Sequence, residues 1–567
     1  MKTTTHKPPR LIPGIIIAAL ILLVRYLLPL VYPEAMLVSF FTGFLGWLAV
    51  LVWWSFFSRA PGRERWMAPV VMVAALVLAS LLLDNSIATA NMGMMFGIYA
   101  PPVVAVAFVA WTVAARAFPG RWRLITMIVT ILLASGIWIF LRTDGMDGNG
   151  RHDLAWRWAV TDEERLLAGG EEKPGPVTPG IGKGGEADWP GFRGPRRNGI
   201  VHGLTIGTDW SAAPPVEVWR KPVGPGCSSF AIRGGLCYTQ EQRGEFELVS
   251  CYDLETGEAV WVHEDRARFY DSHAGPGPRS TPTISGTYVV TAGATGILNL
   301  LNASDGSRVW TRDGATETGA EVLEWGFTAS PLVVGDVVVA SLSGIVAGYD
   351  LQTGRLLWTG RDIKESYSSP HLVTLGGIRQ VLLVGNAGAI SLDPVTGEQL
   401  WEYPWEADGR ILQPALAENG DLVLTREARE LRRVAVSMEN DTWTFDDCWT
   451  SDEIKLNFND FVIHRGYLYG FDGPSLACVN LENGHRTWKG NRYRGWLLLL
   501  EEQDLLLILS EKGDLALVRA DPERFVELAR IRVLEGKTWN HPALAGNILL
   551  VRNAREMAAY RLPELNK

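Results

Sequence analysis

Cysteine is scarce in this chain: its 567 residues include five, and none stands in a CxxC or CxxH arrangement. Structural zinc sites usually draw their ligands from such pairs, so the sequence predicts no metal site. The first cysteine is Cys227, far from the N-terminal apolar residues. We therefore expect no lipid-modified N-terminal cysteine.

A surplus of positive charge is also lacking, since the formal net charge is −9. A nucleic-acid partner requires a basic face that offsets the repulsion between acidic side chains and phosphates. The sequence shows no such face. This argues against nucleic-acid binding.

Long apolar runs fill the first 141 residues, although the rest of the chain has none. A run of about 20 apolar residues is long enough to cross a bilayer as a helix. No small-residue cleavage site follows the first run, which argues against a signal peptide. We predict a five-helix transmembrane domain over residues 1–141, with spans at Leu11–Val31, Ala35–Phe57, Met67–Leu83, Gly93–Ala115 and Trp122–Leu141.

The basic residues of the N-terminus and of the loops between spans lie on one side of the predicted membrane. Three precede the first span, and three arginines lie in each of the loops before the third and the fifth span. The other two loops have no Lys or Arg. Because positive charge is retained in the cytoplasm, we predict a bacterial inner-membrane protein with a cytoplasmic N-terminus and a periplasmic C-terminal part.

Residues 142–188 form the connection to that C-terminal part. Asp162–Ala168 reads as a short helix, and residues 169–185 are rich in Gly and Pro with little apolar content. Such a composition is typical of a flexible linker. We predict a juxtamembrane segment and linker here.

A repeated phrase, Asp-x-x-Thr-Gly-x-x-x-Trp, organises the remainder. Its tryptophans recur every 39 to 49 residues between Trp261 and Trp488, by difference of their numbers. That period suits one four-stranded propeller blade per repeat. In each turn we expect Asp to bond the backbone, Gly to supply a positive φ, and Trp to pack on the neighbouring blade. The clearest copies are Asp253–Trp261, Asn302–Trp310, Asp350–Trp358, Asp393–Trp401 and Asn480–Trp488.

Two decayed copies, near Trp449 and Asp521, bring the count to seven. The last stretch, Ala543–Leu562, has three strand-like runs and no fourth. An early run, Val216–Val223, carries Trp219 and supplies the missing strand, which closes the ring and removes its edge. We predict an all-β, eight-bladed propeller with four-stranded blades over residues 189–567.

These Gly-x-x-x-Trp repeats resemble the pyrroloquinoline-quinone (PQQ) type of propeller repeat, found in quinoprotein dehydrogenases and in BamB-type assembly factors. Asp188–Gly199 (DWPGFRGPRRNG) is similar to an opening motif of bacterial proteins with such repeats. Five spans before a periplasmic propeller also resemble membrane-bound glucose dehydrogenase. The resemblance implies a fold and leaves the activity open.

Two functions follow from the resemblance. The chain lacks the large insertions and the vicinal cysteine pair of the dehydrogenases, and their calcium ligands and catalytic aspartate cannot be placed on it. We therefore expect a scaffold that binds periplasmic proteins or a small polar ligand. The alternative is a membrane dehydrogenase that uses PQQ with calcium and passes electrons to the quinone pool. Whether the chain is an enzyme stays open.

The candidate binding residues lie in two kinds of segment: links that lead into each first strand, and turns between second and third strands. Eightfold closure brings both to one mouth of the channel, where propeller ligands usually bind. Carboxylate, amide and imidazole groups there could hold a cation, a quinone or a polar ligand; the alternative is mutual pairing. The candidates are Glu241, Arg243, Asn459, Asp460, Asn540, His541, Arg552 and Glu556.

Cys237 and Cys251 flank a predicted hairpin at nearly opposed positions. In the periplasm they form either a cross-strand disulfide or two buried thiols. We favour the thiols.

Overall fold

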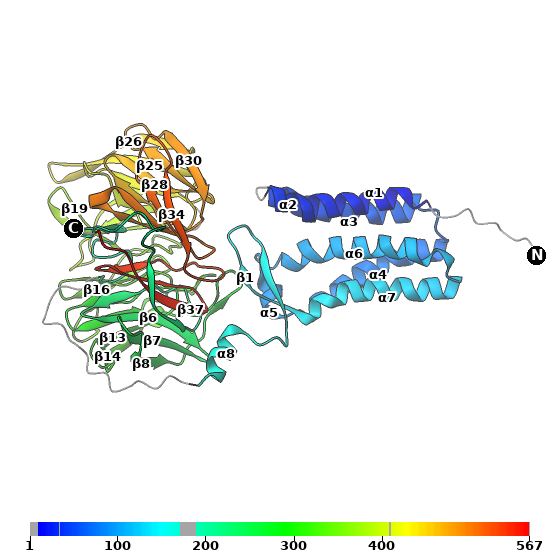
Figure 1. Cartoon of the computed structure of the whole chain (residues 1–567), viewed down its shortest axis with the longest axis horizontal. Coiled ribbons are helices and arrows are strands. Elements are labelled where there is room, and N and C mark those ends of the chain that lie inside the picture. Colours follow the sequence, from blue (N-terminus) through cyan, green and yellow to red (C-terminus); the bar gives the residue numbers. More distant parts are fainter. Residues whose placement is uncertain (1–9, 33–34, 171–188, 408–409, 566–567) are drawn as a thin grey trace, which may run out of the picture. The chain divides into compact units, whose positions relative to one another are not determined.

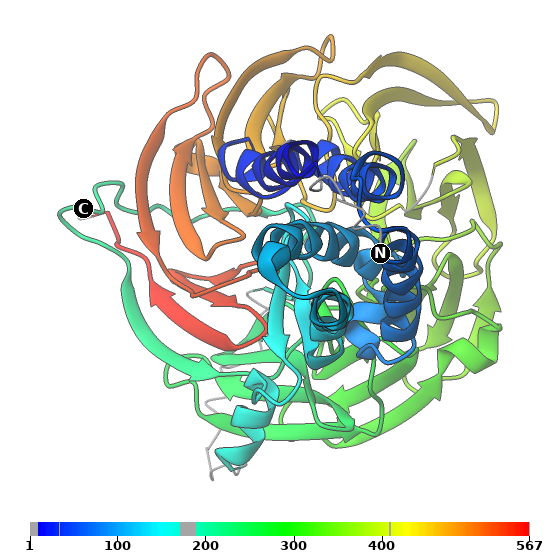
Figure 2. The same ribbon diagram turned by 90° about the vertical axis from the view of Figure 1, so that its right-hand side faces the viewer.

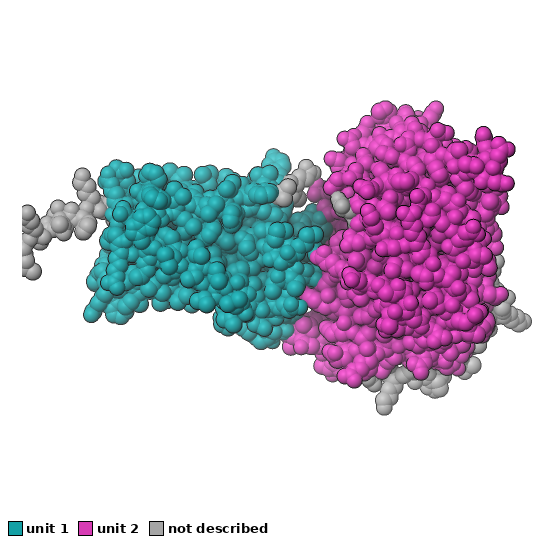
Figure 3. Space-filling model, turned by 180° about the vertical axis from the view of Figure 1, so that it is seen from behind, with its two compact units in different colours: residues 1–159, 272–275 teal, residues 160–271, 276–567 magenta. Residues whose placement is uncertain are grey.

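The computed structural model describes residues 10–32, 35–170, 189–407 and 410–565. It divides into two compact units (Figure 3). The first unit comprises Met1–Ala159 and Ser272–Gly275, and the second comprises Val160–Asp271 and Pro276–Lys567.

Long helices make up most of the first unit (Figure 1). Their inner faces are apolar and buried, with Trp54, Phe108 and Met127 in one core. Their outer faces are apolar too: Leu133, for example, is 69% exposed. Apolar residues on both faces are typical of helices in a bilayer. The helices are α1 (Ile12–Ile21), α2 (Leu28–Val31), α3 (Met36–Val52), α4 (Gly62–Ser80), α5 (Asn85–Thr89), α6 (Met95–Ala114) and α7 (Gly120–Gly136).

Four helical stretches of the described residues are long and apolar enough to span a membrane: Ile12–Val31, Val38–Phe57, Met95–Ala117 and Gly120–Phe140. The fifth predicted span, Met67–Leu83, falls largely in α4. That helix has 19 residues, but its first turn is charged, and Glu64 there pairs with Arg123 at 3.0 Å. The unit is thus compatible with a membrane domain of four or five helices.

After the last helix, β1 (Leu141–Met146) and β2 (His152–Trp156) form an antiparallel hairpin that belongs to the first unit. The predicted short helix is confirmed as α8 (Asp162–Ala168), and it belongs to the second unit. Thr161 and Glu164 form a capping box at its start, which satisfies amides that a helix N-terminus leaves free. Most of the predicted linker, residues 169–185, lies outside the described residues.

The second unit is an eight-bladed β-propeller with four antiparallel strands in each blade, which confirms the predicted fold. Figure 2 shows the blades around a ring. We number them one to eight in chain order, from the blade of β5 to β8 to the blade of β35, β36, β37 and β4. In chain order the strands are β5 (Ala231–Arg233), β6 (Leu236–Arg243), β7 (Phe246–Asp253), β8 (Ala259–Asp265); β11 (Thr283–Ser285), β12 (Tyr288–Ala292), β13 (Ile297–Asn302), β14 (Arg308–Asp313); β15 (Leu332–Val334), β16 (Val337–Leu342), β17 (Ile345–Asp350), β18 (Leu356–Thr359); β19 (His371–Leu375), β20 (Ile378–Gly385), β21 (Gly388–Leu392), β22 (Gln399–Pro404); β23 (Ala415–Leu416), β24 (Leu422–Arg426), β25 (Glu430–Glu439), β26 (Thr442–Ser451); β27 (Val462–His464), β28 (Tyr467–Asp472), β29 (Ser475–Asn480), β30 (Arg486–Arg492); β31 (Trp496–Leu500), β32 (Leu505–Leu509), β33 (Asp514–Arg519), β34 (Glu527–Arg532); and β35 (Ala543–Ala545), β36 (Ile548–Arg552), β37 (Glu556–Arg561) with β4 (Val216–Pro222). Shorter elements are β3 (Ile200–Val201), β9 (Tyr270–Asp271), β10 (Gly275–Pro276) and α9 (Gly314–Thr318).

Strand β4 closes the ring, as predicted. It pairs with β37, and Trp219 lies opposite Ala559. Because β4 comes from the start of the propeller and β37 from its end, blade eight joins the two ends of the domain. The pairing covers the edge that β37 would otherwise expose and gives the last blade its fourth strand.

The tryptophans join neighbouring blades in the way that the repeat predicts. Trp219 in blade eight donates from Nε1 to the Leu254 carbonyl in blade one at 2.9 Å. Its ring covers Gly257, where a Cβ would lie only 2.7 Å away. Gly257 also has φ +68°, so the turn requires glycine both for its backbone conformation and for its lack of a side chain.

Cys237 and Cys251 lie on adjacent strands but do not face each other. Cys237 pairs with Tyr252, whereas Cys251 pairs with Tyr238, one residue along. Successive strand residues point to opposite faces, so the two thiols enter different cores. Both are buried and free, which confirms the thiol alternative.

Candidate functional site

The centre of the propeller is filled by residues 189–201, which we call the channel segment. Its main chain joins blade one at Ile232 and blade two at Ile284, whose amide donates to the Pro190 carbonyl at 2.7 Å. Its other end, β3, pairs in parallel with β31 of blade seven. The segment therefore crosses the axis and contacts the first strands on both sides.

Two buried arginines fix the channel segment to further blades. Arg193 pairs with Asp460 at 3.5 Å and donates to the Phe461 carbonyl in blade six. Arg197 donates to the Ser330 carbonyl at 3.1 Å and to the Pro370 carbonyl at 3.0 Å, in blades three and four. Both arginines have positive φ, 59° and 53°. Such a backbone costs about 1–2 kcal/mol per non-glycine residue, so their contacts must offset it.

Arg197 has no carboxylate within ion-pair distance among the residues that the structure describes. Its remaining acceptors are Thr283 Oγ1, at 3.2 Å, and the Pro331 carbonyl. Burial lowers the pKa of Arg197 to about 9. The guanidinium thus stays charged at neutral pH, and carbonyl dipoles compensate its charge.

Of the eight predicted site residues, the two asparagines join blades to one another. Asn459 donates from Nδ2 to the Gly495 carbonyl at 2.8 Å, which links blade six to blade seven. Asn540 donates to the carbonyls of Gly226 and Ser228 at 2.9 and 2.8 Å, which links blade eight to blade one. Both side chains are buried. Their amides are therefore used by the fold.

Hydroxyl groups make the same kind of link between other blades. The Thr281 amide donates to Ser330 Oγ, and the Ser330 amide donates to Ser369 Oγ, both at 2.9 Å. Gln413 then donates to the Ser369 carbonyl at 3.1 Å. These residues lead into the first strands, so their polarity stabilises the ring.

Asp460 and His541 both lie beside the channel segment, Asp460 against Arg193 and His541 against Phe192, with 5.8 Å between the ring centroids. Burial raises the pKa of Asp460, and Arg193 opposes this rise. Burial and Arg193 lower the pKa of His541 to about 3. His541 is thus neutral at physiological pH and a weak base.

One atom of each of these side chains has no hydrogen-bond partner in the described residues: Asp460 Oδ2 and His541 Nε2. The other imidazole nitrogen, Nδ1, lies 2.8 Å from the Pro542 carbonyl, an arrangement in which Nδ1 carries the proton. Nε2 is then an acceptor, like Oδ2. A small polar group that donates hydrogen bonds would satisfy either atom.

Glu241, Arg243 and Arg552 form a second cluster, between blades one and eight. Glu241 accepts from Arg243 at 3.0 Å, and from Ser250 and Tyr252 at 2.7 and 2.9 Å. Burial favours a raised pKa for Glu241, but the charges of Arg243 and Arg552 and these bonds hold it below its usual value. Arg552 donates to four acceptors, among them the Gln240 and Gly224 carbonyls, both at 2.9 Å.

Glu556, the last of the eight predicted site residues, makes its contacts with other partners. Its carboxylate accepts from Arg220 of β4, the outermost strand of its blade, at 2.6 Å, and from the Glu535 amide at 2.7 Å. Glu556 is the first residue of β37. The turn between β36 and β37 is thus flanked by Arg552, which bonds residues of blade one, and by Glu556, which bonds β4.

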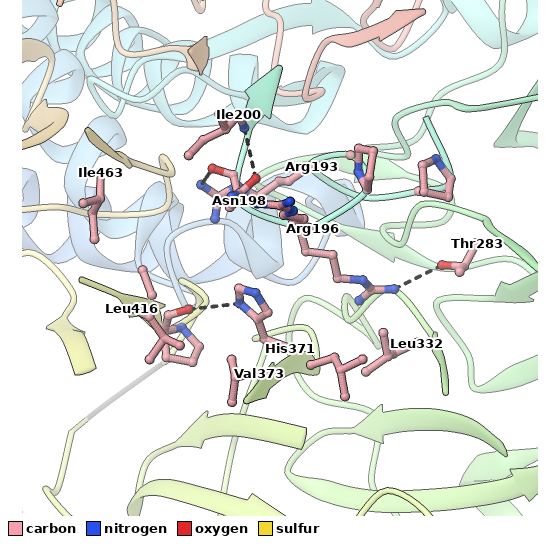
Figure 4. A pocket seen from close by; sticks show the side chains of 18 of the residues that line it. Arg193, Arg196, Asn198, Ile200, Thr283, Leu332, His371, Val373, Leu416 and Ile463 are labelled. Carbon is pink, nitrogen blue, oxygen red and sulfur yellow. Dashed lines mark hydrogen bonds between the residues drawn. The ribbon is translucent and has the colours of Figure 1, made fainter. Parts of the chain in front are cut away.

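A pocket of about 630 Å³ lies beside the channel segment, near the turns that follow the first strands of the blades. Its walls are apolar residues of the first strands of blades two to six, including Leu332, Val373, Leu416 and Ile463. Its polar residues include Arg196, Asn198 and His371 (Figure 4). The sequence analysis does not predict this pocket, although most of residues 190–198 of the predicted opening motif line it.

One group of described residues has a geometry that suits a metal ion. His202, Glu501 and Glu502 offer ligand atoms that all lie within 4.8 Å of one another. His202 Nδ1 already bonds Glu501 at 2.6 Å, and the Gly203 amide donates to Glu502 at 2.7 Å. Existing bonds thus explain the group without an ion.

Comparison with known proteins identifies the repeats. Residues 215–365 match the family model described as "Outer membrane protein assembly factor BamB". The repeats of this stretch are thus similar to those of BamB-type proteins. The matched part spans the closing strand β4 and the first three blades.

Two curated relatives are BamB proteins. One, from Burkholderia pseudomallei, is 27% identical over 29% of this chain and 42% of its own length. The other, from Yersinia pestis, is 22% identical over 61% of this chain and 88% of its own length. Among solved structures, the quinohemoprotein alcohol dehydrogenase of Comamonas testosteroni aligns with a TM-score of 0.49 at 12% identity, over 72% of this chain and 84% of that one.

Proposed function

We propose that this chain is an inner-membrane protein that holds a BamB-like propeller in the periplasm as a scaffold for binding and assembling proteins. The relatives that it resembles are named outer membrane protein assembly factors, which supports an assembly role. The basic residues at the N-terminus and in two membrane loops support the orientation.

The observation that carries this proposal is that the buried ionisable groups of the predicted site make their contacts within the propeller itself. Asp460 holds the channel segment, Glu241 holds Arg243 and two hydroxyls, and His541 is too weak a base for proton abstraction at neutral pH. These contacts stabilise the ring and fill its centre. The binding surface is then the outside of the propeller.

Blade five offers a distinctive surface for a partner. Strands β25 and β26 have 10 residues each, and Ala435–Glu439 pairs with Thr442–Asp446 beyond the end of β24. Phe445 packs on Trp401, with ring centroids 5.2 Å apart, which steadies the extension. Thr444 and other alternate residues of β26 are exposed along the outer edge. An exposed, ordered edge strand can pair with an extended segment of another protein.

The proposal is tested against the dehydrogenase alternative by reconstitution. The full chain, purified in detergent, is incubated with PQQ and calcium, dialysed, and assayed for quinone absorbance and for reduction of an artificial electron acceptor. We expect neither retained quinone nor dye reduction above the level of heat-denatured chain. A stoichiometric quinone spectrum with substrate-dependent dye reduction would contradict the scaffold and support the dehydrogenase.

A further inference from the structure

The pocket beside the channel segment has the size and composition of a small-molecule site. Its volume of about 630 Å³ lies within the usual range for such sites, about 300–1,000 Å³. Strands β11, β15, β19, β23 and β27 provide a mostly apolar wall. The channel segment provides a polar side. This division suits a ligand with an apolar body and one polar end.

The polar side of the pocket carries positive charge. Arg196 is exposed at the pocket, and its guanidinium makes no ion pair or hydrogen bond with the described residues, although its backbone bonds the His371 side chain. Arg197 lies beside it, buried and compensated only by carbonyl and hydroxyl oxygens. Arg193 also lines the pocket, but Asp460 neutralises it. Two arginines without a carboxylate partner thus adjoin the cavity.

Two acidic residues, Glu418 and Glu501, also line the pocket. Glu501 bonds His202 at 2.6 Å, and Glu418 is exposed in the turn after β23, at the rim. Of the two histidines, His464 bonds Asp504 at 2.7 Å and is buried. In the other, His371, the Nδ1 atom lies 3.2 Å from the Pro414 carbonyl oxygen. Burial, Arg193 and Arg197 lower its pKa to about 4, in keeping with a positive potential inside the pocket.

From this arrangement we infer that the pocket binds a small organic acid, with the carboxylate on Arg196 and the apolar body against the first strands. An arginine pairs with a carboxylate through two parallel hydrogen bonds, which gives such a ligand a fixed orientation. Figure 4 shows Arg196 and His371 on the polar side, and Leu332, Val373 and Leu416 among the apolar residues. The inference does not depend on whether the propeller binds a protein partner.

The test compares two probes of nearly equal shape and different charge. The full chain in lipid nanodiscs is titrated with 4-(trifluoromethyl)benzoate and, separately, with 4-(trifluoromethyl)benzamide, and binding is followed by fluorine NMR line broadening. Empty nanodiscs correct for partition into lipid. We expect saturable binding of the benzoate and at least about tenfold weaker binding of the neutral amide, since one charge-assisted contact is lost.

Three variants connect the binding to the pocket. Arg196→Ala should weaken benzoate binding by about tenfold or more and leave the weaker amide binding unchanged. Ile463→Asp places an acid on the apolar wall and should abolish benzoate binding. Arg361→Ala, which removes an exposed arginine that pairs with Glu402 elsewhere on the propeller, is the matched control and should bind like the original chain.

Two results would overturn the inference. One is equal binding of benzoate and benzamide, or no saturable binding of either. The other is benzoate binding that Arg196→Ala and Arg361→Ala weaken to the same degree, which would indicate a general attraction to surface charge. Because Arg196 is exposed, its replacement should not impair folding, and an unchanged melting temperature verifies this point.

Discussion

Replacing Trp219 by alanine tests how the ring is closed. The indole is 8% exposed, its Nε1 bonds the Leu254 carbonyl, and its ring covers Gly257. Truncation leaves a cavity between the last and first blades and one carbonyl without its donor. Core Trp→Ala changes cost about 3–5 kcal/mol, so we expect Trp219→Ala to lower the free energy of unfolding by that amount.

The assay is pulse proteolysis in urea on the full chain in detergent, following the loss of the intact propeller. Trp310→Ala is the first comparison, because Trp310 makes the equivalent contact between blades two and three: its Nε1 donates to the Leu351 carbonyl at 2.9 Å. If blades eight and one are joined as firmly as blades two and three, Trp219→Ala and Trp310→Ala should lower the free energy of unfolding by similar amounts. Trp158→Ala, at a side chain 67% exposed, should change stability by less than about 0.5 kcal/mol. A loss below about 1 kcal/mol for Trp219→Ala would refute the closure.

Three further predictions follow from the same contacts. Gly354→Ala should destabilise the propeller by at least about 2 kcal/mol more than Gly335→Ala: both residues have positive φ, but only at Gly354 would a Cβ lie 2.6 Å from the ring of Trp310, and equal losses in urea would contradict this. Burial raises the pKa of Glu247 to about 7, so the folded chain holds this proton more tightly than the unfolded chain; the stability this contributes is present below the unfolded pKa of about 4.3 and is lost as pH rises through 7. Glu247→Gln should therefore gain stability relative to the original chain between pH 5 and pH 8, and parallel stability profiles would show that Glu247 does not titrate there. Alkaline phosphatase fused after Leu141 should be active, and fused within residues 59–65 it should be inactive; the reverse pattern would overturn the proposed orientation.

The propeller could be predicted because its information is local and repeated. Each Asp-x-x-Thr-Gly turn specifies a hairpin, and each following tryptophan specifies a contact with the next blade. Even the closing strand was predictable, because Trp219 marks Val216–Val223 as a fourth strand that lacks its own blade. The hairpin predicted from the copy Asp350–Trp358, for example, is the turn between β17, which ends at Asp350, and β18, which begins at Leu356.

The site was less predictable because the same residue types serve the fold and the chemistry. Asn459 and Asn540 precede first strands, as ligand-binding residues would, yet they donate to carbonyls of neighbouring blades. Glu556 and Arg552 flank one turn, but Glu556 bonds β4 and Arg552 bonds residues of blade one. Sequence position identified the turns, whereas side-chain direction depended on the tertiary structure.

The channel segment depends on contacts with distant blades, which the local sequence pattern does not predict. The opening motif could be recognised in the sequence, but the path of residues 189–199 depends on carbonyls in blades that follow it by more than 100 residues, such as Ser330 and Phe461. In sequence, Arg193 and Arg197 look like exposed arginines of a loop. Two buried cations in an all-β core would have been predicted only from knowledge of the ring.

The scaffold proposal is tested most directly by photo-crosslinking in living cells. A photoreactive amino acid replaces Thr444, on the extended hairpin of blade five, and in a second strain Glu255, on an exposed turn of blade one. We predict that illumination yields a discrete adduct between the chain and another envelope protein at Thr444, and none at Glu255. Absence of any adduct at Thr444, in cells where the full chain reduces dye in a PQQ-dependent manner, would contradict the account.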